Sequence, residues 1–395
     1  MKLFYSKYLF SMAIIGTALT LASCGQSDKT ATDANKPAAN TEVAAAAPAV
    51  GEEEKILNIY NWSDYIAPDT IANFEKETGI KVRYDVFDSN EILHAKLSAK
   101  NTGYDIVVPS SNWAKLQLEG GLFQKLDKSK LTNWGNLDPN ILKLMEQVDP
   151  GNQYLVDWMW SYNTVGINED KVKAALGDMP MPDNAWDLVF NPKYTNKLKS
   201  CGITFLDTPT DVFQAALHYL GKPIVGGTED DYKAAYDMLL KVRPDIRKFS
   251  SGGQIDDLAA GNVCVAYGWA GDFNLARKRS IENKSEQKIV ALVPKTGGLM
   301  FMDTMAIPAD AKHPGNALKF MNYVMQPKVV AAITNTVTYA NPNKAATEFV
   351  DSEIKNNKSI FLSDEDIAKL VPPSVEDNKT KRNITRLYTR FKTGT

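Results

Sequence analysis

The sequence contains few of the residues that usually form metal sites and nucleophilic centres. It has three cysteines and three histidines among 395 residues. The histidines, His94, His218 and His313, lie far apart and lack the spacing of metal ligands. No H-E-x-x-H, G-x-S-x-G or Walker A pattern occurs. We therefore expect a protein that is not an enzyme, with no catalytic residues, no metal and no cofactor.

The chain also has no excess of charge of one sign. Its 45 basic and 47 acidic residues give a formal net charge of −2, and no basic face stands out, which disfavours a nucleic-acid partner. The basic residues near the end are expected to form the solvated face of a helix. They are Lys379, Lys381, Arg382, Arg386, Arg390 and Lys392.

A long apolar run occurs only at the start, from Tyr8 to Leu21, after Lys2 and Lys7. Small polar residues interrupt it, and it is shorter than the about 20 residues of a transmembrane helix. The sequence Leu-Ala-Ser-Cys that ends at Cys24 resembles the cleavage site of bacterial lipoproteins. We expect residues 1–24 to be a lipoprotein signal, with cleavage before Cys24 and lipid on its thiol. An ordinary signal peptide with an incidental cysteine is the alternative.

Residues 25–54 are rich in Ala, Pro, Thr, Ser, Asp and Lys and contain almost nothing large and apolar. Such a segment cannot bury enough surface to offset the entropy lost on ordering. We expect a disordered tether at residues 25–54, followed by a folded body at residues 55–395. The chain as a whole is 44% hydrophobic. A body of that length is large enough for one globular unit or two lobes with their own cores.

Periodicity in the body predicts alternating strands and helices, typical of an α/β fold. Pro68 and Gly79 bracket a first helix, and Asp88 with Glu91 could form the capping box of a second. The predicted strands are 57–62, 81–87, 104–109, 202–206, 263–269, 289–293 and 299–308. The other predicted helices are 211–220, 232–242, from 272 onward, and 313–325. Two α/β halves of this kind suit a hinged receptor with two lobes, although periodicity alone also permits an enzyme with two domains.

Aromatic and acidic residues recur where the predicted strands end. Ligands of open α/β sheets bind beyond the carboxyl ends of the strands, so these segments are candidates for a site. They are Asn61–Tyr65, Ser110–Trp113, Asp207–Asp211, Gly268–Asp272, Phe301–Asp303 and Tyr339–Asn341. None contains lysine or arginine. Carboxylates would pair with protonated amines and aromatic faces would cover methylenes, although each such residue alone could be a core aromatic or a helix cap.

These segments resemble the putrescine-binding proteins of bacterial polyamine ABC importers, within the periplasmic substrate-binding protein superfamily. The resemblance covers about 55–392 and is most specific in YNWSDYIAPDT, GWAGD and YANPNKAAT. It implies a two-lobed periplasmic-binding-protein fold with a hinge and a ligand cleft between the lobes. Lobe 1 would comprise about 55–160 and 285–345, and lobe 2 about 161–284 and the C-terminal part.

The resemblance also implies a set of ligand-binding residues. Trp62 and Trp269 would flank the aliphatic chain, and Asp272 and Asp303 would pair with the ammonium ends. The full set is Trp62, Ser63, Asp64, Tyr65, Ser110, Asp211, Trp269, Asp272, Phe301, Asp303 and Tyr339. Asp211 departs from the glutamate of the putrescine receptor, and Asn112 is a second position that could tune the fit.

The remaining cysteines, Cys201 and Cys264, could pair in an oxidising compartment or remain two separate thiols, and the resemblance implies a disulfide. The expected protein is a monomeric, periplasmic lipoprotein, held on a membrane by lipid, that delivers putrescine or a related polyamine to an importer permease. A spermidine-preferring receptor, a polyamine sensor and a secreted hydrolase are the alternatives.

Overall fold

The computed structural model describes residues 53–371 and 376–395. These residues belong to one unit of the chain, Gly51–Thr395. The expected signal, the lipidated Cys24 and nearly all of the expected tether lie outside the described residues. No helix in the described part of the chain is both long and apolar enough to cross a membrane.

The first part of the body is the predicted alternation of parallel strands and helices. Its elements are β1 (Ile56–Trp62), α1 (Thr70–Thr78), β2 (Lys81–Phe87), α2 (Asn90–Ser98), β3 (Ile106–Val107) and α3 (Ser111–Glu119). β1 pairs in parallel with β2 on one side and with β3 on the other. Parallel strands need crossover connections, and the amphipathic segments 70–78 and 90–98 provide them. β3 is shorter than the expected strand 104–109.

Two predicted helix starts are wrong. α1 begins at Thr70, so Pro68 precedes the helix, although Gly79 does end it with a left-handed φ of 72°. The cap of α2 is Ser89, whose side chain accepts from the backbone N–H of Ile92. Asp88 lies one residue too early for a capping box and accepts a hydrogen bond from Ser63 instead.

The rest of the chain repeats the alternation and adds strands to both halves of the sheet. Its strands are β5 (Ile203–Phe205), β6 (Ile246–Phe249), β7 (Val265–Trp269), β8 (Ile289–Ala291) and β9 (Met300–Ala306). Its helices include α8 (Pro209–Tyr219), α9 (Glu229–Val242), α10 (Gln254–Ala259), α11 (Ala270–Glu282), α12 (Pro314–Val324) and α13 (Pro327–Val337). Most of these agree with the predicted elements to within a few residues. β6 was not predicted.

The strand β4 (Leu155–Asn168) was also not predicted, and it joins the two parts of the sheet. It is antiparallel to β9 over Leu155–Tyr162, and then pairs with β7 over Asn163–Ile167. The strand order is β2-β1-β3-β9-β4-β7-β5-β6, with β8 beside β4. Each half of β4 therefore belongs to a different half of the sheet, and all its residues are buried.

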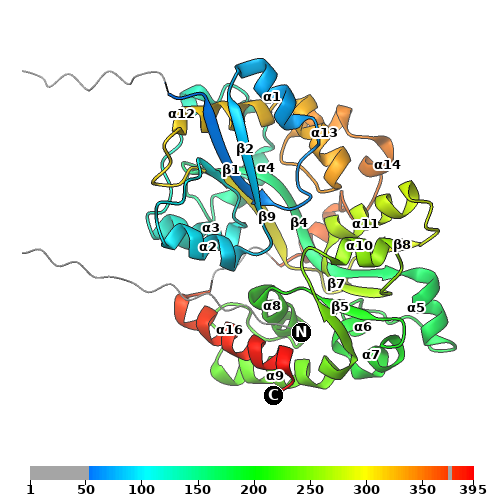
Figure 1. Ribbon diagram of the computed structural model, residues 1–395. Coiled ribbons are helices and arrows are strands. Elements are labelled where there is room, and N and C mark those ends of the chain that lie inside the picture. Colours follow the sequence, from blue (N-terminus) through cyan, green and yellow to red (C-terminus); the bar gives the residue numbers. More distant parts are fainter. Residues whose placement is uncertain (1–52, 372–375) are drawn as a thin grey trace, which may run out of the picture. The chain divides into compact units, whose positions relative to one another are not determined.

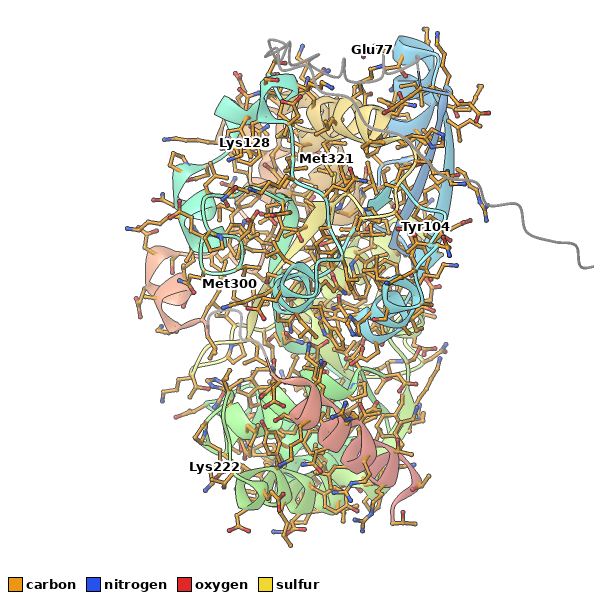
Figure 2. All side chains as sticks on the ribbon, turned by 90° about the vertical axis from the view of Figure 1, so that its left-hand side faces the viewer. Glu77, Tyr104, Lys128, Lys222, Met300 and Met321 are labelled. Carbon is orange, nitrogen blue, oxygen red and sulfur yellow. A yellow bond between two sulfur atoms is a disulfide. The ribbon has the colours of Figure 1, made fainter. Side chains whose placement is uncertain are left out.

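Helices cover both halves of the sheet (Figure 1). α1 contacts β2 and α12 contacts β1, while α8 and α9 pack together against α16 (Asn378–Thr393). Side chains fill the space between these layers (Figure 2): Met321 of α12 is fully buried, whereas Lys128 and Lys222 are exposed. The remaining helices are α4 (Pro139–Met145), α5 (Glu169–Leu176), α6 (Asp187–Phe190), α7 (Pro192–Leu198), α14 (Ser352–Lys355) and α15 (Asp364–Lys369).

The C-terminal helix α16 corrects one expectation about the basic residues near the chain's end. Lys379, Arg382, Arg386 and Arg390 are exposed, as expected for a solvated face. Lys381 is instead buried, with 8% of its surface exposed. Lys381 lies on the same face of α16 as the apolar residues that pack on α8 and α9, so its side chain is buried with them.

The structure joins Cys201 and Cys264 in a disulfide, with their Cα atoms 5.5 Å apart. Cys201 follows α7, and Cys264 immediately precedes β7. The bridge therefore ties the end of a helix to the strand that carries Trp269. This outcome confirms the implied pairing and excludes two separate thiols.

Candidate functional site

A single cavity collects every ligand-binding residue that the sequence implied. It encloses about 650 Å³, counted with its opening to solvent. Its lining contains Trp62, Ser63, Asp64, Tyr65, Ser110, Asp211, Trp269, Asp272, Phe301, Asp303 and Tyr339. It also contains Asp88, Asn90, Asn112, Ser251, Gly252 and Ile255, of which only Asn112 had been considered for the site from the sequence.

The sheet places several of these residues together because they lie at or just after the carboxyl ends of neighbouring strands, whereas Phe301 and Asp303 lie within β9 and Tyr339 follows α13. Trp62 is the last residue of β1, and Trp269 is the last residue of β7. Asp272 and Asp211 lie in the first turns of α11 and α8, where the helix dipole favours a negative charge. Phe301 and Asp303, together with Ser110, reach the cavity from β9 and the residue that precedes α3.

Asp303 is held by two hydroxyl groups. Tyr65 donates to its Oδ2 at 2.8 Å, and Ser110 donates to its Oδ1 at 2.6 Å. Asn90 in turn donates from its side-chain amide to Ser110 Oγ at 2.9 Å. Only 3% of Asp303 is exposed, and this burial raises the pKa of its carboxyl to about 7, against the opposing effect of the two hydroxyls.

Asp272 has a similar environment on the other half of the sheet. Tyr339 donates to its Oδ1 at 2.7 Å, and Gln254 donates to its Oδ2 at 3.2 Å. Burial raises the pKa of this carboxyl to about 6. The ring of Tyr339 lies so close to Gly271 that a Cβ at this position would overlap it. Gly271, the second glycine of the sequence GWAGD, is therefore required for Tyr339 to approach Asp272.

Asp211 also lines the cavity, and it remains partly exposed. Desolvation raises the pKa of its carboxyl to about 7, and the negative charge of Glu91 adds to this effect. The Tyr267 hydroxyl donates to the backbone carbonyl of Asp211 at 2.7 Å, which fixes the first turn of α8 against β7. The side chain of Asp211 thus lies in the cavity, as the resemblance implied.

Aromatic rings form the apolar part of the cavity. The rings of Trp62 and Trp269 meet edge to face with centroids 5.7 Å apart, and Phe301 lies 6.5 Å from Trp269. The Trp62 indole N–H donates to the carbonyl of Val108 at 2.9 Å, which fixes the ring. Trp62 and Trp269 come from different halves of the sheet. We call the space between their rings and that of Phe301 the aromatic box, and its width depends on how the two halves of the sheet are placed.

The cavity lining contains no lysine or arginine among the described residues. The carboxylate of Asp64 does have a cationic partner from outside the lining. It lies 2.6 Å from the guanidinium of Arg279 on α11, which also pairs with Asp256 at 2.8 Å. The carboxyls of Asp211, Asp272 and Asp303, and that of the exposed Asp88, pair with no lysine or arginine among the described residues. Buried carboxyls that lack a cation of the protein favour a ligand that supplies one.

Sequence reasoning missed several lining residues for identifiable reasons. Asp88 and Asn90 directly follow β2, so the strand-end rule that found the other residues applies to them equally. Ser251 and Gly252 follow β6, a strand that was not predicted. Within the described residues, no group of three or more His, Cys, Asp or Glu side chains could hold a metal ion.

Comparison with known proteins identifies the class. The family model of bacterial extracellular solute-binding proteins matches residues 69–361. The chain is 51% identical over 343 residues to the putrescine-binding periplasmic protein PotF of Escherichia coli, covering 87% of this chain and 92% of that protein. It is 47% identical over 349 residues to the putrescine-binding periplasmic protein SpuD of Pseudomonas aeruginosa, covering 88% and 95%.

A solved structure extends the likeness to the fold. A protein of Listeria monocytogenes assigned to a spermidine/putrescine ABC transporter matches with a TM-score of 0.76 and 30% identity, covering 87% of this chain and all of that chain. The chain therefore belongs to the bacterial extracellular solute-binding protein family. The expected two-lobed periplasmic-binding-protein fold is confirmed, and the relatives are binding proteins of transport systems that act outside the cytoplasm.

Proposed function

We propose that this protein is an extracytoplasmic receptor that binds a linear polyamine, putrescine in the first place, and delivers it to the permease of an ABC importer. The observation that carries the proposal is the combination, in one cavity, of an aromatic box with the buried carboxyls of Asp272 and Asp303 and the partly exposed carboxyl of Asp211, none of which pairs with a cation among the described residues. Two relatives at 51% and 47% identity bear names that state putrescine binding, which supports the same ligand.

In the proposed complex, the two ammonium groups of putrescine meet Asp272 and Asp303, the methylenes lie against Trp62 and Trp269, and Asp211 belongs to the same set of ligand-binding residues. Each ammonium then exchanges its hydration for a carboxylate and for aromatic faces, which attract cations by about 0.5 to 2 kcal/mol each. Tyr339 and Tyr65 act as positioning residues, because their hydroxyls hold the carboxylates of Asp272 and Asp303.

The proposed movement is closure of two lobes about a hinge, in which a ligand that contacts both lobes favours the closed state. We assign about 55–160 and 285–345 to lobe 1, and about 161–284 and the C-terminal part to lobe 2. The change of partner along β4, from β9 to β7 between Tyr162 and Asn163, supports the boundary near residue 160. The boundary near residue 285 needs adjustment, because β8 pairs with Gly166–Asn168 of β4 and therefore goes with lobe 2. Trp62 and Trp269 would then approach each other from opposite lobes as the cleft closes.

We also propose that residues 1–24 direct export, that lipid on Cys24 holds the protein on a membrane, and that residues 25–54 act as a tether. The receptor is proposed to act as a monomer. Cys24→Ser should abolish labelling with a radioactive fatty acid, while putrescine binding is retained. Persistent labelling of the variant would overturn the anchor.

Isothermal titration with putrescine, cadaverine and spermidine tests the ligand. Asp303→Asn should weaken putrescine binding by about 2–5 kcal/mol, because one buried ammonium loses its charged partner. Asp170→Asn provides a matched control, since Asp170 is exposed and pairs with Lys288 on the surface. Equal binding by the Asp303 variant and the control would refute the proposed site, and strongest binding of spermidine would favour the spermidine-preferring receptor.

A further inference from the structure

A stripe of positive charge lies on the exposed side of the C-terminal helix α16. This helix contains six basic residues and no acidic residue, in a chain whose charges are nearly balanced overall. Two of the six are engaged within the protein, because Lys381 is buried and Lys392 pairs with Asp207 at 2.7 Å. The other four are exposed, and we call them the basic stripe: Lys379, Arg382, Arg386 and Arg390.

The spacing of the basic stripe brings its charges to one side of the helix. Steps of three and four residues make nearly a full turn, so the four side chains lie within about 80° around the helix axis and about 17 Å along it. The opposite side carries Ile384, Leu387 and Phe391, which are buried in the same core as α8 and α9. The basic stripe therefore faces away from the protein, and Figure 2 shows α16, in faint red, at the surface.

No carboxylate of the protein neutralises the basic stripe, since none of its residues forms an ion pair among the described residues. Arg386 donates to the side chain of Asn383 at 2.9 Å, and the guanidinium of Arg390 lies 5.1 Å from the centre of the Tyr236 ring. Asp377, the acidic residue at the start of the helix, is engaged as its cap and accepts from a backbone N–H at 2.7 Å. The four charges are thus available to an anionic partner.

The basic stripe is suited to a flat anionic surface that it contacts by charge alone. A helix with a basic face is typical of proteins that bind membrane surfaces. Within the described residues, α16 has no exposed large apolar side chain, because its apolar side is packed against the core. The helix therefore has nothing to insert between acyl chains, and its contact with a membrane would be reversible and weakened by salt.

The start of the body makes a membrane the nearest such surface. The carboxylate of Glu53 accepts from the backbone N–H groups of Gly315 and Asn316 at the start of α12, which fixes where the chain enters the body. If Cys24 carries lipid, as proposed above, residues 25–52 can separate the membrane from Glu53 by at most about 95 Å. The folded body then stays close to the anionic headgroups, which raises their effective concentration.

We propose that the basic stripe is a docking surface for the anionic phospholipid headgroups of the membrane to which the protein is tethered. Docking holds this side of lobe 2 against the membrane in which an importer permease lies. The inference rests on the proposed lipid anchor for the nearness of the membrane. It goes beyond that anchor by giving the folded body a membrane affinity of its own.

Cosedimentation of the full chain with vesicles tests this affinity, and Cys24→Ser removes any contribution of an attached lipid. In about 0.05 M salt the protein should bind vesicles of equal parts phosphatidylglycerol and phosphatidylcholine. Binding should be at least about tenfold weaker to phosphatidylcholine alone, and to the anionic vesicles in about 0.5 M salt.

Two pairs of substitutions in this background locate the contact. Arg382→Gln with Arg386→Gln should weaken binding to the anionic vesicles about 25-fold, because each basic residue near such a surface contributes about fivefold. Lys173→Gln with Lys197→Gln removes the same charge from exposed positions of α5 and α7 and should retain the binding. Equal binding by the two double variants, or binding that does not depend on phosphatidylglycerol, would overturn the inference.

Binding that requires reconstituted permease in the vesicles would also overturn it, in favour of an acidic protein surface. The basic stripe lies outside the ligand cavity, so both double variants should bind putrescine with unchanged affinity in calorimetry. This readout separates the inference from the proposed function. If the protein bound no polyamine, or if Cys24→Ser still took up fatty acid, the proposed ligand or the proposed anchor would fail whatever the vesicles show.

Discussion

Affinity for the polyamine should fall steeply when the pH is lowered from 7 to 5. Burial raises the pKa of Asp303 and of Asp211 to about 7 and that of Asp272 to about 6. A bound ammonium stabilises the ionised carboxylate, so each of these groups has a lower pKa in the complex than in the free protein. The alkyl ammonium groups keep their protons throughout this range, because amines of this kind titrate near pH 10.

The size of the effect follows from the protonated fraction of each carboxyl. A carboxyl with a pKa of about 7 is half protonated at pH 7 and about 99% protonated at pH 5. Because the ammonium binds the ionised carboxylate, the loss of this form weakens binding about 50-fold over this range. Asp272, with a pKa of about 6, should contribute about tenfold. At pH 7, binding should release about one proton in total.

Calorimetry in two buffers that differ in ionisation enthalpy, such as phosphate and Tris, measures both the affinity and the released protons.

The stability of the free protein should change with pH in the opposite direction to the affinity. Because the folded pKa values of Asp211, Asp272 and Asp303 lie above their unfolded values, the free protein should lose stability as the pH rises from about 4 to about 7. An affinity that is constant between pH 5 and pH 7, without proton release, would refute the reasoning.

Three further predictions concern the packing and fit of the site. Gly271→Ala should push the ring of Tyr339 out of place and weaken putrescine binding at least about tenfold. Gly135→Ala is the control, because the space around its Cβ is open, and it should bind putrescine normally. Equal putrescine affinities of the two variants would contradict the packing argument. Cys264→Ser removes a bridge that spans 63 residues and should lower the free energy of unfolding by about 4 kcal/mol in urea titrations, and a loss below about 1 kcal/mol would show that the bridge constrains little. Asp211→Glu should tighten putrescine and sharpen its preference over cadaverine and spermidine, because the carboxylate advances by about 1.5 Å; unchanged affinities for all three would exclude Asp211 from ligand contact.

The sequence was sufficient to predict the site residues at the ends of β1 and β7, whereas Asp88 and Asn90 after β2 were overlooked. Trp62, Trp269 and Asp272 were found because the carboxyl ends of strands meet at one edge of a sheet, a rule that requires only the strand positions. The same rule failed for Ser251 because β6 is four residues long and has two exposed positions, which leaves little apolar periodicity to detect.

Pairings across the fold could not be predicted from the sequence. Asp64 was expected to be free for a ligand, yet its carboxylate meets Arg279, which lies 215 residues further along the chain. Lys381 was expected on a solvated face because its sequence neighbours are basic. Its burial depends on where Trp113 and Glu91 come to lie, and no local pattern contains this information.

The failure to predict β4 has a physical cause that also bears on the proposed hinge. A strand that crosses both halves of the sheet is buried along its whole length, so its polar residues do not mark a solvent face and the usual alternation is absent. Thr164 donates to the carbonyl of Leu292 at 2.5 Å, and Asn168 donates to Gln287 at 2.7 Å, which makes their burial tolerable. Asp157 is different, because neither of its oxygens has a partner among the described residues, and burial beside Asp303 holds its pKa well above the usual range.

These contacts limit where the proposed closure can bend the chain. Unpairing β4 from β9 or from β7 would expose buried backbone groups and the side-chain hydrogen bonds that make the strand's polar residues tolerable. Closure should therefore keep both ladders and concentrate its change of φ and ψ between Tyr162 and Asn163, where the partner strand changes. The cavity carboxyls Asp303 and Asp272 lie on β9 and after β7, on either side of that point, so that a small rotation there changes the distance between them.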